Sequence, residues 1–132
     1  MKSNSLLSDN PLHIVDVGAW DGMHSRWNEF TSSYKGILFE PDPKEHKLLK
    51  SKCGKNLIVL NSALSDSAGE LDLHLCQKPG VSSVYWPNID FLSKFPEIER
   101  FDVVKNIKVQ GDTLNNQLKK NNIFDIDFMK ID

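Results

Sequence analysis

Short apolar runs alternate with amphipathic segments along the first half of the chain. Three runs are typical of buried strands: His13 to Val17, Gly36 to Glu40 and Asn56 to Asn61. Residues 22–33, with Met23, Trp27 and Phe30, and residues 43–53, with Leu48, Leu49 and Cys53, place apolar side chains at helical spacing, and Pro43 suits a first helical position. This alternating order predicts a parallel sheet with crossover helices.

The pattern changes after the third strand. Residues 70–76 alternate leucines with Glu70, Asp72 and His74, which predicts a half-exposed strand in a β extension. Residues 79–102 contain three prolines and five aromatic residues, which predicts a loop with one short helix near 89–95. Those aromatics suit a lid over a ligand, but ordinary packing is the simpler explanation.

The C-terminal part returns to regular elements. Residues 106–110 predict a strand, and Asp112 or Thr113 suits the N-cap of a following helix. Ile126 to Asp132 predicts a fourth core strand at the end of the sequence. We therefore expect one partial α/β domain over residues 1–132, mostly parallel and truncated after that strand. An edge left exposed there would allow a homodimer.

Composition narrows the function classes. The 132 residues carry 16 Lys and Arg against 18 Asp and Glu, a net charge of -2, which gives no reason to expect nucleic acid or an anionic membrane as a partner. No apolar run approaches a membrane span. Cys53 and Cys76 have no metal-ligand spacing, and we expect reduced thiols, a cytoplasmic location and no metal site.

The stretch "VDVGAWDG" turns sharply after the first strand. Gly18 and Gly22 would let a ligand approach the backbone, the N–H groups at the next helix start would favour an anion, and Asp16 would complement a cation. A site that favours both an anion and a cation indicates a zwitterionic ligand, such as the aminocarboxylate of a methionine moiety. A dinucleotide fingerprint would need glycines where Trp20 and Met23 stand, which disfavours a nicotinamide cofactor.

The next two strand ends extend this site. Glu40 lies about 20 residues beyond the glycine turn, where an acid accepts the hydroxyls of a ribose. After the third strand, Ser62, Ala63 and Ser65 leave room for a flat base, and Asp66 suits an exocyclic amine, although such a turn needs no ligand.

The sequence resembles the FkbM-type family of class I S-adenosylmethionine-dependent methyltransferases. The resemblance rests on "VDVGAWDG", "LFEPDP", "LNSALSDSAGELDL", "GVSSV", "VQGDTLNNQL" and "DFMKID", which follow one another in family order. It implies a Rossmann-like methyltransferase sheet and S-adenosyl-L-methionine as cofactor. The family often has Asn where this chain has Trp20, and its last strand is usually followed by an acidic stretch beyond Asp132.

The resemblance also implies roles for particular residues. Asp16, Gly18, Ala19 and Gly22 would lie at the methionine end of the cofactor, Glu40 at the ribose, and Ala63, Leu64 and Ser65 around the adenine. The reaction would be O-methylation of a hydroxyl on a sugar or secondary metabolite, a small-molecule acceptor. Asp132, and less strongly Lys130 or His24, are candidates for the catalytic base. The alternative is a non-catalytic, truncated nucleotide-binding or interaction module of the same fold.

Overall fold

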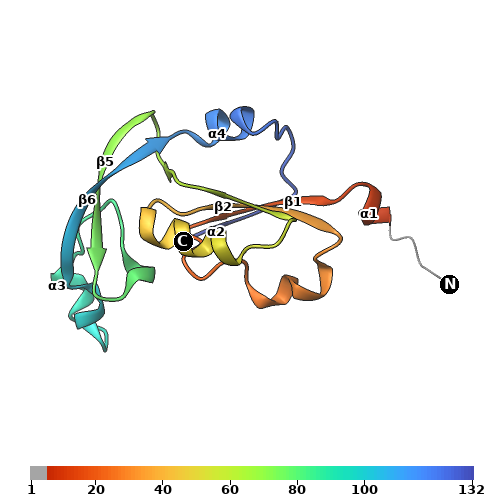
Figure 1. Ribbon diagram of the computed structural model, residues 1–132. Helices are drawn as coiled ribbons and strands as arrows, with labels where there is room; N and C mark the ends of the chain where they lie inside the picture. Colours follow the sequence, from red (N-terminus) through yellow and green to blue (C-terminus); the bar gives the residue numbers. More distant parts are fainter. Residues whose placement is uncertain (1–5) are drawn as a thin grey trace.

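The computed structural model describes residues 6–132, which form a four-stranded parallel sheet and a smaller three-stranded sheet (Figure 1). The central sheet has the order β3-β2-β1-β7, and its strands are β1 (Leu12–Val17), β2 (Tyr34–Phe39), β3 (Leu57–Leu60) and β7 (Phe128–Ile131). This confirms the predicted Rossmann-like arrangement of α/β class. All four carboxyl ends lie at one edge of the sheet.

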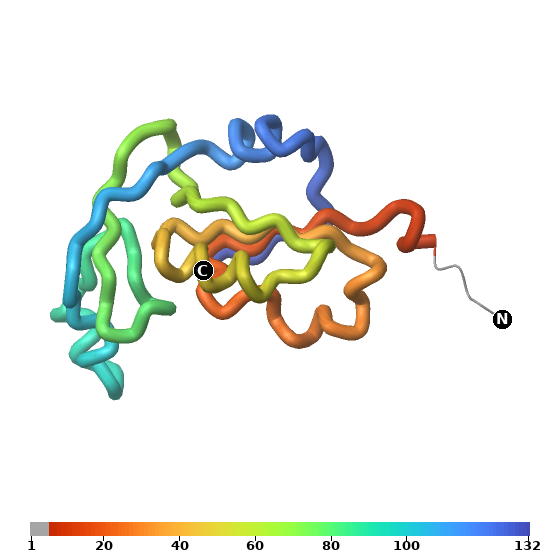
Figure 2. The backbone as a smooth tube through the Cα atoms, in the orientation of Figure 1, coloured from red at the N-terminus to blue at the C-terminus, as the bar shows by residue number. Residues whose placement is uncertain are grey.

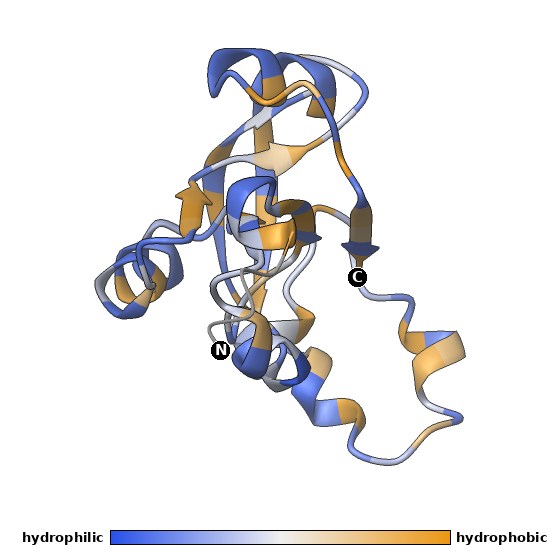
Figure 3. Cartoon of the chain, turned by 90° about the vertical axis from the view of Figure 1, so that its right-hand side faces the viewer, coloured by the Kyte–Doolittle hydropathy of each residue, from blue (hydrophilic) through white to orange (hydrophobic). Residues whose placement is uncertain are grey.

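Helices cover both faces of the central sheet. On one face, Leu38 and Val59 pack against Leu49 of α2 (Pro43–Lys52). On the other, Val15, Ile37 and Phe39 form a core against which α4 (Leu114–Lys120) packs. Both helices carry hydrophilic and hydrophobic positions along their length (Figure 3). The described helices also include the single turns α1 (Leu6–Asp9) and α3 (Ile89–Leu92). No helix within residues 6–132 is long and apolar enough to cross a bilayer.

The second sheet is the predicted β extension. It consists of β4 (Ala63–Leu64), β6 (Val103–Asp112) and β5 (Gly69–Cys76), in that order. Figures 1 and 2 show β5 and β6 running beside the carboxyl ends of the central strands. Between them the chain forms α3 and two 3-10 turns, η2 (Pro79–Val81) and η3 (Ile98–Phe101). The extension therefore reaches the edge where a ligand of this fold would bind.

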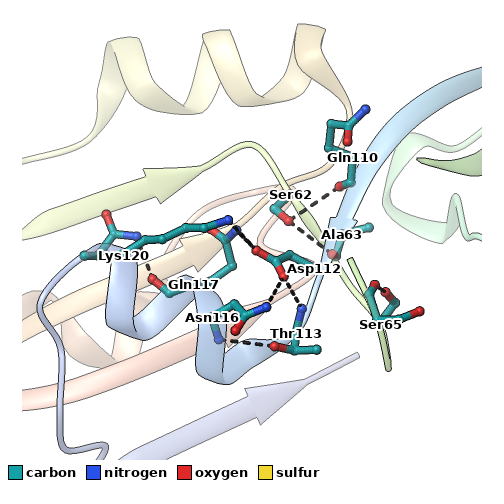
Figure 4. A network of polar contacts seen from close by, with 11 residues as sticks. Ser62, Ala63, Ser65, Gln110, Asp112, Thr113, Asn116, Gln117 and Lys120 are labelled. Atoms are coloured by element: carbon teal, nitrogen blue, oxygen red, sulfur yellow. Dashed lines mark hydrogen bonds and ion pairs between the residues drawn. The ribbon is translucent and has the colours of Figure 1, made fainter. Parts of the chain in front are cut away.

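A buried carboxylate joins β6 to α4 (Figure 4). Asp112 accepts hydrogen bonds from the Thr113 N–H at 2.8 Å, from the side-chain amides of Asn116 and Gln117, and from Lys120 Nζ at 2.7 Å. Thr113 is the N-cap, since its hydroxyl accepts from the Asn116 N–H. These hydrogen bonds, that from Lys120 first, hold the pKa of Asp112 well below its usual range.

Three local predictions are wrong. The segment after the first turn is not an α-helix over 22–33 but the 3-10 helix η1 (Ser25–Phe30). Gly22 has a φ of +80°, which is not helical, and the N-cap of the helix is His24, so the helix begins only at Ser25. Leu48 is exposed, since α2 turns Leu49 and Cys53 inward instead. His74 was expected on an exposed face, yet it is buried beneath Trp86, whose ring stacks on it at 4.2 Å.

Candidate functional site

Two carboxylates lie at the carboxyl ends of neighbouring strands. Asp16 is on β1, and Glu40 directly follows β2. Asp16 pairs with Leu38 across the parallel sheet, and Leu38 and Glu40 share a face because side chains alternate along a strand. Both carboxylates therefore point to the same face, and both are buried, with 5% and 6% of their surface exposed.

The turn after β1 folds back over the end of β2. The N–H groups of Gly18 and Ala19 both donate to the Phe39 carbonyl, at 3.1 and 3.2 Å, and Ala19 is buried. Gly18 and Gly22 adopt φ values of +77° and +80°, which a side chain would make strained. The glycines are thus needed for the turn itself. The predicted anion site at a helix start is missing, because η1 is short and begins only at Ser25.

A cavity of about 530 Å³ opens beside this turn and is lined by all four predicted methionine-end residues, Asp16, Gly18, Ala19 and Gly22. Its charged and ionisable lining consists of Asp16, Asp21, His24, Arg26, Lys130 and Asp132. Apart from His24, three carboxylates face two cationic side chains, so the lining has an excess of negative charge. His24 is the N-cap of η1, and its Nδ1 accepts from the Arg26 N–H.

Lys130 joins two of those carboxylates. Its Nζ lies 3.1 Å from Asp16 Oδ1 and forms an ion pair with Asp132 on the same face of β7. Burial raises the pKa of Asp16, and the hydrogen bond from Lys130 limits that rise. Burial lowers the pKa of Lys130, but the bonds to Asp132 and Asp16 outweigh it and the pKa is raised overall. The lysine therefore stays charged, and with both carboxylates ionised the trio has a formal net charge of minus one.

Glu40 lines a second, smaller cavity of about 70 Å³. Its Oε1 accepts a hydrogen bond from the Asp42 N–H at 2.9 Å, and burial raises the pKa of Glu40 to about 7. Gly18, Trp20 and Gly80 line both this cavity and the first one. The two acids thus face adjoining cavities, as a ligand spanning both strand ends requires.

The residues predicted around an adenine lie apart from that pair of cavities. Ala63 is buried against Leu73, which lines the second cavity. Leu64 and Ser65 instead line a third cavity, of about 500 Å³, beside Tyr85 and Trp86. The Ser65 hydroxyl donates to the Ser67 carbonyl at 2.5 Å. The structure therefore brings Asp16, Gly18, Ala19, Gly22, Glu40 and Asp132 together, but separates them from Leu64 and Ser65.

The sequence predicts no binding role for three lining residues, Trp20, Arg26 and Gly80, and indicates Lys130 only as an alternative base to Asp132. The pairing of Lys130 with Asp16 requires the register of β1 against β7. Arg26 follows the misassigned helix start, and Trp20 and Gly80 meet across 60 residues of chain. For Arg26 the sequence offers one signal of a binding role, which is a positive side chain shortly after a glycine turn.

Comparison with known proteins gives a match to a family model. The family model described as the Methyltransferase FkbM domain matches residues 16–132, which includes both carboxylates and Lys130. Neither the search of curated proteins nor the search of solved structures finds a match.

Proposed function

Because the chain belongs to the FkbM methyltransferase family, we propose that it binds S-adenosylmethionine at the ends of β1 and β2 and methylates a hydroxyl group of a sugar or secondary metabolite. The observation that carries this proposal is the placement of Asp16 and Glu40. They are buried, lie on one face of adjacent strands, and line adjoining cavities.

The first cavity suits the amino-acid end of this cofactor. An α-ammonium group is a cation, and the net negative charge that Asp16, Lys130 and Asp132 share would favour it. Arg26 lines the same cavity and offers guanidinium donors to an α-carboxylate, in place of the helix start that the sequence had indicated. Gly18 and Gly22 keep the turn free of side chains.

The second cavity suits the ribose. An ionised Glu40 accepts hydrogen bonds from two vicinal hydroxyls, and its burial makes those bonds stronger than they would be in water. The carboxylate of Glu40 is already oriented by the Asp42 N–H. The adenine surround of Ala63, Leu64 and Ser65 stays a prediction, and only Ala63 has a packing link to this cavity, through Leu73.

When bound, the cofactor supplies an electrophilic methyl group on a sulfonium, so the chain has to position and deprotonate the acceptor. Asp132 lies at the end of β7 in the first cavity, and its carboxylate is mostly exposed, which leaves it accessible to a hydroxyl proton. Lys130 forms an ion pair with that carboxylate and so orients it. In this proposal Asp132 is the general base and Lys130 is a positioning residue.

Isothermal titration calorimetry tests the cofactor assignment. The 132-residue chain is titrated separately with S-adenosylhomocysteine and with NAD. We expect binding of the first and none of the second. Binding of NAD alone would contradict the proposal, and binding of S-adenosylhomocysteine without methyl transfer to any hydroxyl acceptor would favour a non-catalytic nucleotide-binding module.

A further inference from the structure

Trp20 stands where the two cavities meet. It lines both the cavity at Asp16 and the cavity at Glu40, together with Gly18 and Gly80. A ligand that contacts both carboxylates therefore has to pass this indole. Trp20 is 36% exposed, so its ring is partly open to whatever occupies the passage.

The indole packs directly against Gly80 of η2. A Cβ atom added to Gly80 would lie 2.8 Å from Trp20 Cε3 and 3.3 Å from Cδ2 and Cζ3. The ring thus occupies the space that a side chain at Gly80 would take. The turn that presents Gly80 is itself fixed, since the Ser82 N–H donates to the Pro79 carbonyl and the Ser82 hydroxyl accepts from the Cys76 N–H.

The proposed cofactor carries its positive sulfur between the amino-acid part and the ribose. If those parts contact Asp16 and Glu40, the sulfur lies in the passage beside Trp20. An indole attracts cations through the negative face of its ring, more strongly than phenylalanine does, whereas a neutral thioether lacks this charge-based attraction and keeps only a sulfur–aromatic contact. Gly18 and Gly80, the other two residues shared by both cavities, have no side chain to compete.

Resting on the proposed function, we infer that Trp20 is a specificity-determining residue that recognises the sulfonium charge and so favours the methyl donor over its demethylated product. The two ligands differ by one methyl group and one positive charge. Asp16 and Asp132 also line the first cavity and attract the sulfonium, so Trp20 adds to an existing preference. This discrimination would help the site release product and take up donor.

Calorimetry of both ligands measures this contribution. The ratio of dissociation constants, S-adenosylhomocysteine over S-adenosylmethionine, is determined for wild type, Trp20→Leu and Trp20→Phe. We expect the ratio to fall about two- to thirty-fold in Trp20→Leu and to fall less in Trp20→Phe. Sinefungin carries an ammonium group in place of the sulfonium, so it tests whether the charge or the size of the methyl group is recognised. If the charge is recognised, sinefungin should lose affinity for Trp20→Leu in parallel with the donor.

Trp86→Leu is the matched control. This variant also loses one indole, but Trp86 stacks on His74 and lines neither of the two cavities. Because Trp86 shares the third cavity with Leu64 and Ser65, its loss could weaken both ligands through the adenine they have in common, but that effect cancels in the ratio, which should keep its wild-type value. An unchanged ratio in Trp20→Leu overturns the role of Trp20. If circular dichroism shows that Trp20→Leu is not folded, an unchanged ratio in Trp20→Phe overturns the role of Trp20. Failure of wild type to bind either ligand overturns the proposed function itself.

Discussion

Lys130 Nζ lies 3.1 Å from Asp16 Oδ1, and the two residues are direct partners in the register of β7 against β1. The sheet itself therefore brings the ammonium group to a carboxylate that is almost completely buried. A buried carboxylate without such a partner is unfavourable. The pairing of the outer strand with β1 thus supports the charge state of the candidate site.

Replacing Lys130 with methionine should destabilise the fold at neutral pH. The variant keeps the aliphatic stem but leaves Asp16 without its cation, and we expect a loss of about 1–2 kcal/mol, moderated by the partial exposure of Lys130. The loss should shrink at about pH 5, because an unpaired Asp16 takes up a proton more readily. Urea unfolding at both pH values measures it. A loss that is equal at both would contradict the pairing.

Glu40 should oppose folding when it ionises. Its pKa in the folded protein is about 7 against an ordinary value of 4.5, so the unfavourable effect is absent below pH 4.5, grows between 4.5 and 7, and is complete above 7. Glu40→Gln should therefore be more stable than wild type at about pH 8, on the order of 1–2 kcal/mol, and equal to it at about pH 4.5.

Chemical denaturation across that pH range measures the difference. Glu29→Gln removes a carboxylate on the exposed surface of η1 and serves as the matched control. A Glu40→Gln variant less stable than wild type at pH 8 would indicate that the carboxylate forms favourable contacts beyond the Asp42 N–H.

The hydrogen bonds around Asp112 predict the opposite pH dependence. Because its pKa is lowered, Asp112 stabilises the fold above the ordinary value of 3.8, and the effect is lost as pH falls toward the lowered pKa. Asp112→Asn should unfold at lower urea than wild type at about pH 7. The two proteins should converge in acid. Asp125→Asn, which changes an exposed acid outside this set of hydrogen bonds, is the matched control.

Gly22 should be required for the turn even without ligand. An alanine there would hold φ at +80° and place its Cβ 3.1 Å from Leu49 Cδ1. We expect Gly22→Ala to lose about 1–2 kcal/mol of stability. Gly69→Ala is the control, because a Cβ there meets nothing within 4 Å. Thermal unfolding of both variants distinguishes them, and equal midpoints would contradict this account of the turn.

Local pattern was enough to predict the strand ends and the two main acids. Asp16 and Glu40 each follow apolar residues, with Gly18 two residues beyond Asp16 and Pro41 directly after Glu40, so their positions at the sheet edge depend on short-range signals alone. The N-terminal Pro43 of α2 was predictable for the same reason.

Long-range contacts were not predictable in this way. The apolar spacing of Met23, Trp27 and Phe30 suggested an α-helix, but Trp27 packs on Tyr34 and Phe128, which a short 3-10 helix also allows. Leu64 and Ser65 have suitable turn chemistry, yet β4 pairs with β6 and directs them to another cavity. The meeting of Trp20 with Gly80 depends on how the second sheet lies beside the carboxyl ends of the first.

The central claim is that one nucleoside ligand contacts Glu40 while its amino-acid part lies near Asp16. Calorimetric titration of S-adenosylhomocysteine into wild type and Glu40→Ala tests it most directly, with circular dichroism to show that the variant is folded. We predict that the variant binds more weakly by about 1–3 kcal/mol, the effect of leaving buried ribose hydroxyls unpaired. An unchanged affinity in the folded variant would remove Glu40 from the site and contradict the account.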